Sequence, residues 1–521
     1  MRYLFLTAFI FIYSFSVAED TKTPEDFNKE DFIAGAENGR KYNMAIQDCI
    51  SLSLGNNLDI KISRIYPELR AEDINYAKSI FEPYFLADFN FHDRSYPSNT
   101  EPFQLEGLNL PGLERFVTPD VSAFRDGNLD FSVGGMIPTG AKYELFFENN
   151  RYKTNSGGAL YNPSYSSEAG ISVTQPLLRG FGIDINTADI VIARNSYDMS
   201  AEEFRNNVID VISKSKEMYY KCVFAKEAYL IAEDYLKLAG ELYEINRKRY
   251  EKGLISSVDL LESESAVAER KRYVIQSEAA VKRSEDNLKL VTNIISDPEF
   301  WNSDIELLDK PDFSVVDVSI TDSLKDAFEY RPDYKSMTIS LKNNDVRIKV
   351  AKNATLPTLD LTGSFGLNGL GKDIQKALED IDYRHKDWYA GLTLKIPWGG
   401  GERADLRKKE LEKAVALLQL KNLEHNIILD VRDKVREVSV QERQVYAAKL
   451  FRDTETKNYD AQKKRFNAGQ VSTHDMLDYQ DKLSEAKLNY VNALIEYHIA
   501  LINLDKSTGL TLIKNAVRLE E

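Results

Sequence analysis

Beyond its first eighteen residues, the chain lacks any stretch of about 18 consecutive uncharged apolar residues. This absence excludes a protein held by membrane-spanning helices. It does not exclude one that crosses a membrane as β-strands, because strands that alternate apolar and polar residues have low mean hydropathy. An excess of positive charge is also lacking. The net charge of −15 argues against nucleic acid and anionic lipid as partners.

Cysteine and histidine are scarce, with two and five copies respectively. Cys49 and Cys222 lie within helical patterns, and we interpret them as buried packing residues rather than as a disulfide or a metal site. The histidines show no metal-ligand spacing, and no phosphate-binding loop, nucleophile elbow or paired-metal motif occurs. The sequence therefore predicts no enzyme, no cofactor and no metal site.

The amino terminus is typical of an export signal. Arg2 precedes an apolar core, and the small residues Ser16 and Ala18 suit signal peptidase. The alternative, a short membrane anchor, is disfavoured because the apolar run falls short of the ~20 residues that a spanning helix needs. We predict a signal peptide at residues 1–18, followed by a charged, flexible tail at residues 19–41.

One segment occurs twice, since residues 249–261 reappear in similar form as residues 465–477. The matched positions share a glycine followed by an aspartate, namely Gly253 and Asp259 in the first copy and Gly469 and Asp475 in the second. Such a match predicts one unit duplicated within the chain.

A second set of landmarks repeats at a larger offset. Asp59 and Pro83 match Asp333 and Pro357. The difference between the two offsets indicates an insertion in the first half. We place the first repeat at residues 42–300, a linker at 301–318 and the second repeat at 319–521.

Glycine and proline are nearly absent from two long regions, about 184–296 and 402–508, in which apolar residues recur at helical spacing. A helix of ~60 residues is ~90 Å long, so such helices need lateral packing against one another. Gly253 and Gly469 interrupt these regions, and each predicts the turn of an antiparallel helical hairpin. The many charged residues indicate faces exposed to water.

Alternating apolar and polar residues predict four strands, at about 84–92, 168–176, 358–366 and 388–396. Period-two segments of this length fit either a half-buried soluble sheet or the wall of a membrane barrel, and the alternation leaves both open. The second strand of each pair ends in proline and glycine before a long helix begins. These residues are predicted strand-to-helix hinges: Pro176, Gly180, Gly182, Pro397, Gly399 and Gly400.

Taken in order, these landmarks resemble the TolC-like outer membrane efflux protein family over almost the whole mature chain. The features that carry the resemblance are Asn57-Leu-Asp59, the segment from Gln175 to Gly182, Arg331-Pro-Asp333, Leu356-Pro357, Pro397 with its glycines, and the two hairpin turns. The resemblance implies a mainly α fold with membrane β-structure: one outer-membrane β-barrel shared by a homotrimer, continuous with a long periplasmic α-helical coiled-coil barrel.

The implied function is a passive exit duct of a tripartite efflux or type I secretion system. An inner-membrane pump would drive transport through a periplasmic adaptor, and outer-membrane lipid would surround the barrel. The alternative is a soluble periplasmic coiled-coil scaffold or adaptor. The sequence does not identify the cargo.

A trimer is expected on physical grounds too, because four strands from one chain leave exposed edges and cannot close a pore. The insertion, at about 93–167, contains two further alternating segments around Pro138 and Gly140, which predict a hairpin. This hairpin either adds two wall strands, giving six per chain, or forms an extracellular flap. We slightly favour the flap.

By resemblance, the hairpin tips form a closable iris at the periplasmic end. Asp475 and Asp478 lie one helical turn apart, so three copies would stack two rings of carboxylates at the pore constriction. The alternative is an ordinary solvated helix face. Phe466 and Val471 occupy positions where some family members have a tyrosine and an arginine that latch the iris. We therefore expect closure to depend on apolar packing, with little effect of salt on gating.

The tips are also where the family meets the adaptor. The predicted docking residues are small or apolar residues of the two turns, with the acidic and hydroxyl residues beside them: Gly253, Leu254, Ile255, Ser256, Asp259, Gly469, Val471 and Ser472. The alternative is turn chemistry alone, which requires glycine whether or not a partner binds.

Overall fold

The computed structural model describes residues 41–97, 121–155, 159–293 and 303–519. The predicted signal peptide, nearly all of the predicted tail and part of the insertion lie outside the described residues. The chain forms two compact units. Among the described residues, one unit, which we call the tip unit, comprises residues 41–58, 211–293, 303–316 and 437–502; the other, the sheet unit, comprises residues 59–97, 121–155, 159–210, 317–436 and 503–519.

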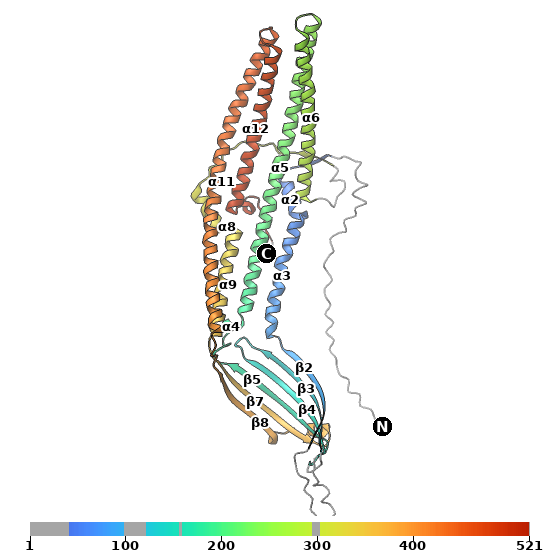
Figure 1. The fold of residues 1–521 in the computed structure, drawn as a ribbon, viewed down its shortest axis with the longest axis vertical. Helices are drawn as coiled ribbons and strands as arrows, with labels where there is room; N and C mark the ends of the chain where they lie inside the picture. The colour runs from blue at the N-terminus through green and yellow to red at the C-terminus, as the bar shows by residue number, and fades with distance from the viewer. Residues whose placement is uncertain (1–40, 98–120, 156–158, 294–302, 520–521) are drawn as a thin grey trace, which may run out of the picture. The chain divides into compact units, whose positions relative to one another are not determined.

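The sheet unit contains one sheet of six antiparallel strands, in the order β2-β3-β4-β5-β7-β8 (Figure 1). The strands are β2 (Tyr84–Pro97), β3 (Val121–Met136), β4 (Lys142–Thr154), β5 (Ser164–Pro176), β7 (Thr358–Gly371) and β8 (Lys386–Lys395).

Two of these strands, β3 and β4, come from the insertion in the first repeat. They pair with β2 on one side and β5 on the other. The preference for an extracellular flap is therefore wrong, and the alternative of six strands per chain is correct. The physical reason is that a two-stranded hairpin outside the sheet would leave its own backbone edges unpaired, whereas between β2 and β5 both of its edges are hydrogen-bonded.

The two faces of the sheet differ in polarity. One face carries exposed apolar side chains from every strand, among them Phe85, Leu129, Leu145, Ile171, Phe365 and Trp388. The other carries mainly polar side chains, such as Asp88, Ser132, Glu148, Ser172 and Thr362. Because successive strand residues point to opposite faces, the period-two pattern of the sequence separates the faces. An exposed apolar face opposite a polar one is typical of a barrel wall in lipid.

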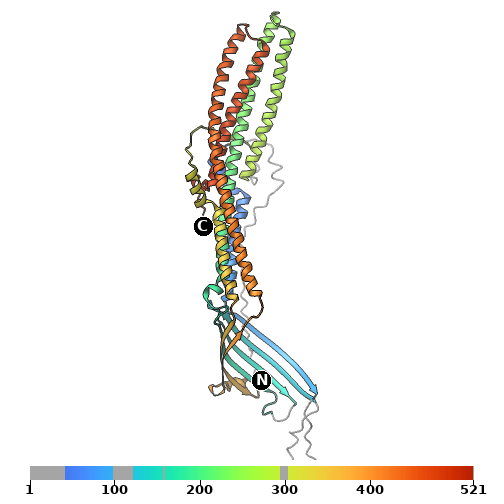
Figure 2. The ribbon, with the colours of Figure 1, turned by 60° about the vertical axis from the view of Figure 1, so that its left-hand side comes forward.

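Short helices and turns complete the sheet unit. They are α3 (Leu58–Lys78), the turn Ser79–Phe81, α4 (Ile183–Asn186), α8 (Ile320–Tyr330), α9 (Pro332–Ala354), α10 (Ile374–Glu379), the turn Tyr383–His385 and α13 (Thr511–Lys514). Figure 2 shows the strands and the helices of this unit from a second direction.

The Arg331-Pro-Asp333 motif joins the helices of the sheet unit. Pro332 begins α9, where its missing N–H leaves no bond unmade. The Arg331 guanidinium bonds Asp333 at 2.9 Å, Asp430 at 2.8 Å and the Ser507 carbonyl at 3.1 Å. One cation thus ties three chain segments that are distant in sequence, which explains why the motif stands out.

The tip unit consists of antiparallel helical hairpins. The long helices are α5 (Ala188–Glu251), α6 (Ser257–Thr292), α11 (Gly401–Asn467) and α12 (Thr473–Thr508), of which α5 and α11 begin in the sheet unit. Helix α2 (Ile46–Asn56) and a parallel pair of short strands, β1 (Lys41–Met44) and β6 (Asp304–Leu307), pack beside them. No helix within the described ranges is long and apolar enough to span a membrane.

A core of the tip unit includes Met44, Tyr219, Leu288 and both cysteines. The prediction for Cys49 and Cys222 is confirmed, since both are free and fully buried. Burial raises the pKa of the Cys222 thiol to about 11, so this thiol stays protonated and unreactive at neutral pH.

Candidate functional site

The two hairpin turns have the same backbone geometry. Gly253 and Gly469 have positive φ angles of 71° and 76°, which glycine adopts without strain. In the first turn, the N–H of Leu254 donates to the Arg249 carbonyl and that of Gly253 to the Tyr250 carbonyl. In the second turn, the N–H of Gln470 donates to the Arg465 carbonyl and that of Gly469 to the Phe466 carbonyl. Each turn is therefore a Schellman motif, which explains why glycine recurs.

A capping box follows each turn. Ser256 Oγ accepts a bond from the Asp259 N–H, and the Asp259 carboxylate accepts one from the Ser256 N–H. In the second tip, Ser472 Oγ accepts from the Asp475 N–H and donates to the Asp475 carboxylate at 2.7 Å. These bonds lower the pKa of Asp475 and keep it ionised. Both duplicated aspartates thus have a local role at a helix start.

The first tip presents an apolar surface. Leu254, Val258 and Leu261 are 70%, 71% and 65% exposed. The last two lie one turn apart on α6, so they share a face. We call these three residues the tip stripe. Leu254 is among the docking residues predicted from the sequence, whereas Val258 and Leu261 are not, although their helical spacing after the glycine is a usable signal.

The predicted constriction residues lie in different surroundings. Phe466 is buried with Tyr459, Met476 and Leu483, and Val471 packs against this cluster. The Arg249 guanidinium lies over the Phe466 ring at 4.4 Å. Phe466 thus joins the packing between the hairpins of one chain.

The acidic pair of the second tip is exposed. Asp478 bonds Lys482 at 2.7 Å, and both side chains are half exposed. Directly before the pair, His474 Nδ1 lies 2.8 Å from the Glu262 carboxylate on α6, which raises the pKa of His474. The structure therefore brings Asp475 and Asp478 onto the first two turns of α12, beside a contact between the hairpins.

A buried arginine links the hairpins further along the helices. Arg270 on α6 is only 3% exposed. Its guanidinium lies 3.7 Å from the Tyr235 ring centroid on α5, bonds Asp481 of α12 at 2.8 Å and donates to Gln480. A buried charge is stable only when it is paired in this way. No sequence motif marked Arg270, because its partners come from two other helices.

We expect Arg270→Met to destabilise the tip unit by about 2–4 kcal/mol, since the buried Gln480 oxygen loses its donor and the cation–π contact is lost. Asp481 is largely exposed and can turn to water, which limits the cost. The measurement is the thermal midpoint of the purified protein. Arg272→Met is the matched control, because Arg272 is an exposed neighbour on α6. Equal destabilisation by both variants would contradict this role.

The two predicted hinge regions differ. In the first, Gly180 and Gly182 have positive φ angles of 82° and 108°, and the Asn186 side chain donates to both of their carbonyls. Pro176 ends β5. The second region has Pro397 after β8, and a side chain on Gly399 or Gly400 would meet no neighbouring atom. The first strand-to-helix connection is thus held by hydrogen bonds from the Asn186 side chain, whereas Gly399 and Gly400 in the second have free space around them.

The polar face of the sheet carries a row of carboxylates that the sequence analysis missed. Asp88 of β2 pairs in register with Asp130 of β3, and Glu148 of β4 pairs with Glu168 of β5. The residues are far apart in sequence, so only the strand register reveals the row. It gives this face a negative potential. Within the described residues, these carboxylates and the other metal-ligating side chains form no group of three or more that could hold a metal ion.

The fold and its surfaces define a class of protein: one that combines a β-sheet with an exposed apolar face and long helical hairpins with exposed tips. Solved structures share this fold. The Campylobacter jejuni CmeC outer membrane channel superposes with a TM-score of 0.60 at 18% identity, covering 89% of this chain and 85% of that one. For VceC of Vibrio cholerae the TM-score is 0.60 at 11% identity, with 89% and 96% covered.

The model of the outer membrane efflux protein family matches residues 144–293 and 324–510. Among relatives, nodulation protein T of Rhizobium leguminosarum bv. trifolii is 23% identical over 397 residues, 72% of this chain and 79% of its own. Outer membrane protein TolC of Vibrio cholerae is 21% identical over 366 residues, 69% and 80%.

The chain belongs to the outer membrane efflux protein family. It has the duplicated TolC-like fold and is an outer-membrane channel that provides the exit duct of an efflux system. The family consists of channel and transport proteins rather than enzymes. The soluble scaffold considered from the sequence is therefore wrong.

Proposed function

We propose that three copies of this chain form one channel with a closed barrel of three six-stranded sheets. The observation that carries the proposal is that β2 and β8 are the two edges of the sheet. Lipid offers no hydrogen bonds to an open edge, so each edge requires a partner strand. Pairing β2 of one copy with β8 of the next satisfies both edges, and closure makes the polar face the lumen.

Two helices of the sheet unit support the same assembly. Each carries an exposed apolar stripe at helical spacing: Ile62, Ile65, Leu69 and Tyr76 on α3, and Leu411, Val415, Leu418 and Leu429 on α11. No part of the described chain covers either stripe, and the exposure of these apolar side chains to water is unfavourable. A neighbouring copy that packs its α3 stripe against this α11 stripe buries them together.

The channel is passive, and we propose that an inner-membrane pump drives it through a periplasmic adaptor that docks at the tips. The tip stripe supports docking, because these exposed apolar side chains have no packing role within the part of the chain that the structure describes. The docking residues are those predicted above, now joined by Val258 and Leu261. At the closed end, Asp475 and Asp478 of three copies form the rings of the constriction, with Val471 and Phe466 in the packing behind them.

The test is the mass of the protein purified from outer membranes in mild detergent, measured by light scattering with the detergent contribution subtracted. We expect three copies per particle. A particle of one copy in mild detergent, from material that still fractionates with the outer membrane, would overturn the assembly.

A further inference from the structure

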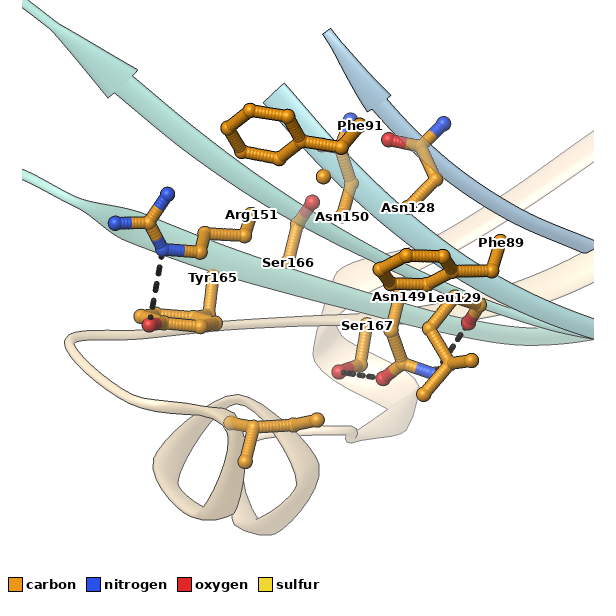
Figure 3. A pocket seen from close by; sticks show the side chains of 12 residues that line it. Phe89, Phe91, Asn128, Leu129, Asn149, Asn150, Arg151, Tyr165, Ser166 and Ser167 are labelled. Carbon is orange, nitrogen blue, oxygen red and sulfur yellow. Dashed lines mark hydrogen bonds between the residues drawn. The ribbon is translucent and has the colours of Figure 1, made fainter. Parts of the chain in front are cut away.

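A cavity of about 250 Å³ opens on the apolar face of the sheet (Figure 3). It lies at the middle of β2 and β3 and near the ends of β4 and β5 that are distant from the helices. Phe91, Gly127, Arg151 and Tyr165 are successive register partners across β2, β3, β4 and β5, so they form one row on this face. Gly127 creates the hollow, since it has no side chain between Phe91 and Arg151.

The next row forms the floor of the cavity and has no free polar groups. Phe89 pairs with Leu129 on β3. Asn149 donates to the Leu129 carbonyl at 3.2 Å and accepts from Ser167 Oγ at 2.7 Å, as the dashed lines in Figure 3 show. The amide and the hydroxyl are thus paired with each other or with the backbone, and the phenyl and leucyl groups are left to contact a ligand.

Helix α10 walls the cavity through Ile374. This short helix lies on the apolar face, because side chains on Gly369 and Gly371 would approach the Ala377 backbone to 2.1 and 2.4 Å. The two glycines therefore let α10 rest directly on β7. Ile374 and Leu378 remain exposed.

The charge around the cavity is positive. Arg151 Nε donates to the Tyr165 hydroxyl at 3.2 Å, which fixes the guanidinium at the rim (Figure 3). Lys153 is exposed two residues further along β4, and its register partner is Arg125. Asp93 pairs with Arg125 at 2.9 Å. Among the described residues, no carboxylate forms an ion pair with Arg151 or Lys153.

The position of these cations relative to the membrane identifies their partner. Nearer the helices, the same face carries the apolar side chains of Phe131, Val133 and Val173, which suit the hydrocarbon of a membrane. The helices extend into the periplasm, so the opposite end of the strands lies in the outer leaflet. Arg151 and Lys153 thus stand where the apolar band ends, at the level of lipid headgroups.

We propose that this cavity binds a phosphate-bearing lipid of the outer leaflet. An acyl chain lies against Phe91, Leu129 and Ile374, and the phosphate accepts charge-assisted hydrogen bonds from Arg151 and Lys153. The net charge of −15 does not oppose this, because Asp88, Asp130, Glu148 and Glu168 lie on the other face of the sheet and Asp93, on this face, is paired with Arg125. The proposal depends on the outer-membrane location and is independent of adaptor docking.

The experiment is native mass spectrometry of the full-length protein in detergent, titrated with an acylated, diphosphorylated glucosamine disaccharide and with the same lipid after dephosphorylation. We expect the phosphorylated lipid to bind at least about tenfold more tightly, as expected for hydrogen bonds between two charged groups. The double variant Arg151→Gln, Lys153→Gln should lose this preference. Gly127→Val should weaken the binding of both lipids, because it fills the hollow.

Matched controls are available on the same sheet. Gly363 faces the same side, and a side chain there would meet only the Tyr389 carbonyl at 3.9 Å, so Gly363→Val should bind both lipids normally. Lys142→Gln removes an exposed cation at the other end of β4 and should keep the phosphate preference. Equal affinity for the two lipids would overturn the proposal. So would equally tight binding of the water-soluble phosphorylated disaccharide, which has no acyl chain.

Discussion

Replacing Val415 and Leu418 together with glutamate should leave this protein unable to form the trimer that we propose. Each side chain that moves from water into an apolar interface contributes roughly 1.5–3 kcal/mol, and every interface occurs three times in the assembly. The variant loses these contributions and in addition places two carboxylates against the apolar stripe of α3. The measurement is the particle mass in mild detergent, together with the fraction of the protein found in the outer membrane.

Lys421→Glu is the control for the stripe. It introduces the same side chain on the same helix, at an exposed position beside the stripe. We expect its trimers to form normally, because a solvated charge on a helix surface changes stability little. If the double glutamate variant assembled as well as this control, the α11 stripe would have no role between copies.

Gly253→Trp should abolish transport and leave the trimer intact. A Cβ at this glycine meets no atom of the described residues within 4 Å, so the indole has room to project from the tip into the surface that we assign to the adaptor. The positive φ adds a local cost of roughly 1–2 kcal/mol, which one turn of a large assembly tolerates. The measurement is co-purification of the adaptor and pump with the channel, where we expect a loss of at least about tenfold.

Gly253→Asn is the control that shows whether the loss in Gly253→Trp comes from a blocked docking surface or from strain in the turn. Asparagine adopts the left-handed conformation more readily than other residues and adds little bulk. We therefore expect co-purification close to that of the unaltered protein. Val258→Asp with Leu261→Asp should repeat the loss without touching the turn, because both residues belong to the exposed tip stripe. Normal co-purification by Gly253→Trp would refute docking at this tip.

The hairpin tips show how much local sequence can predict. A glycine that requires positive φ, followed by a serine and an aspartate that cap the next helix, acts within a few residues. The turns at Gly253 and Gly469 could therefore be predicted from sequence without any tertiary contact. The duplication could also be recognised from the sequence, because both turns require the same residue types at the same spacing.

The insertion shows where this reasoning fails. Its alternating segments predicted a hairpin, but alternation does not say which strands lie next to it. That choice depends on the backbone edges that β2 and β5 must satisfy in the sheet. Likewise, Arg270 is an ordinary helix residue until Tyr235, Gln480 and Asp481 come together around it.

The net charge shows a third limit. A value of −15 suggested that anionic lipid is no partner, yet Arg151 and Lys153 gather on one face while Asp88, Asp130 and Glu148 point to the other. The net charge of the chain does not say on which face the charged residues lie, whereas a lipid contacts only one face of the sheet.

By itself the sequence determined the long helices, their glycine turns, the duplication and the alternating strands, because each follows from the conformational preferences of residues a few positions apart. The tertiary structure alone decided the number of strands in the wall, the partners of the buried arginine and the cavity beside Arg151. Those features depend on residues that are distant in the chain and become neighbours only through strand register and helix packing.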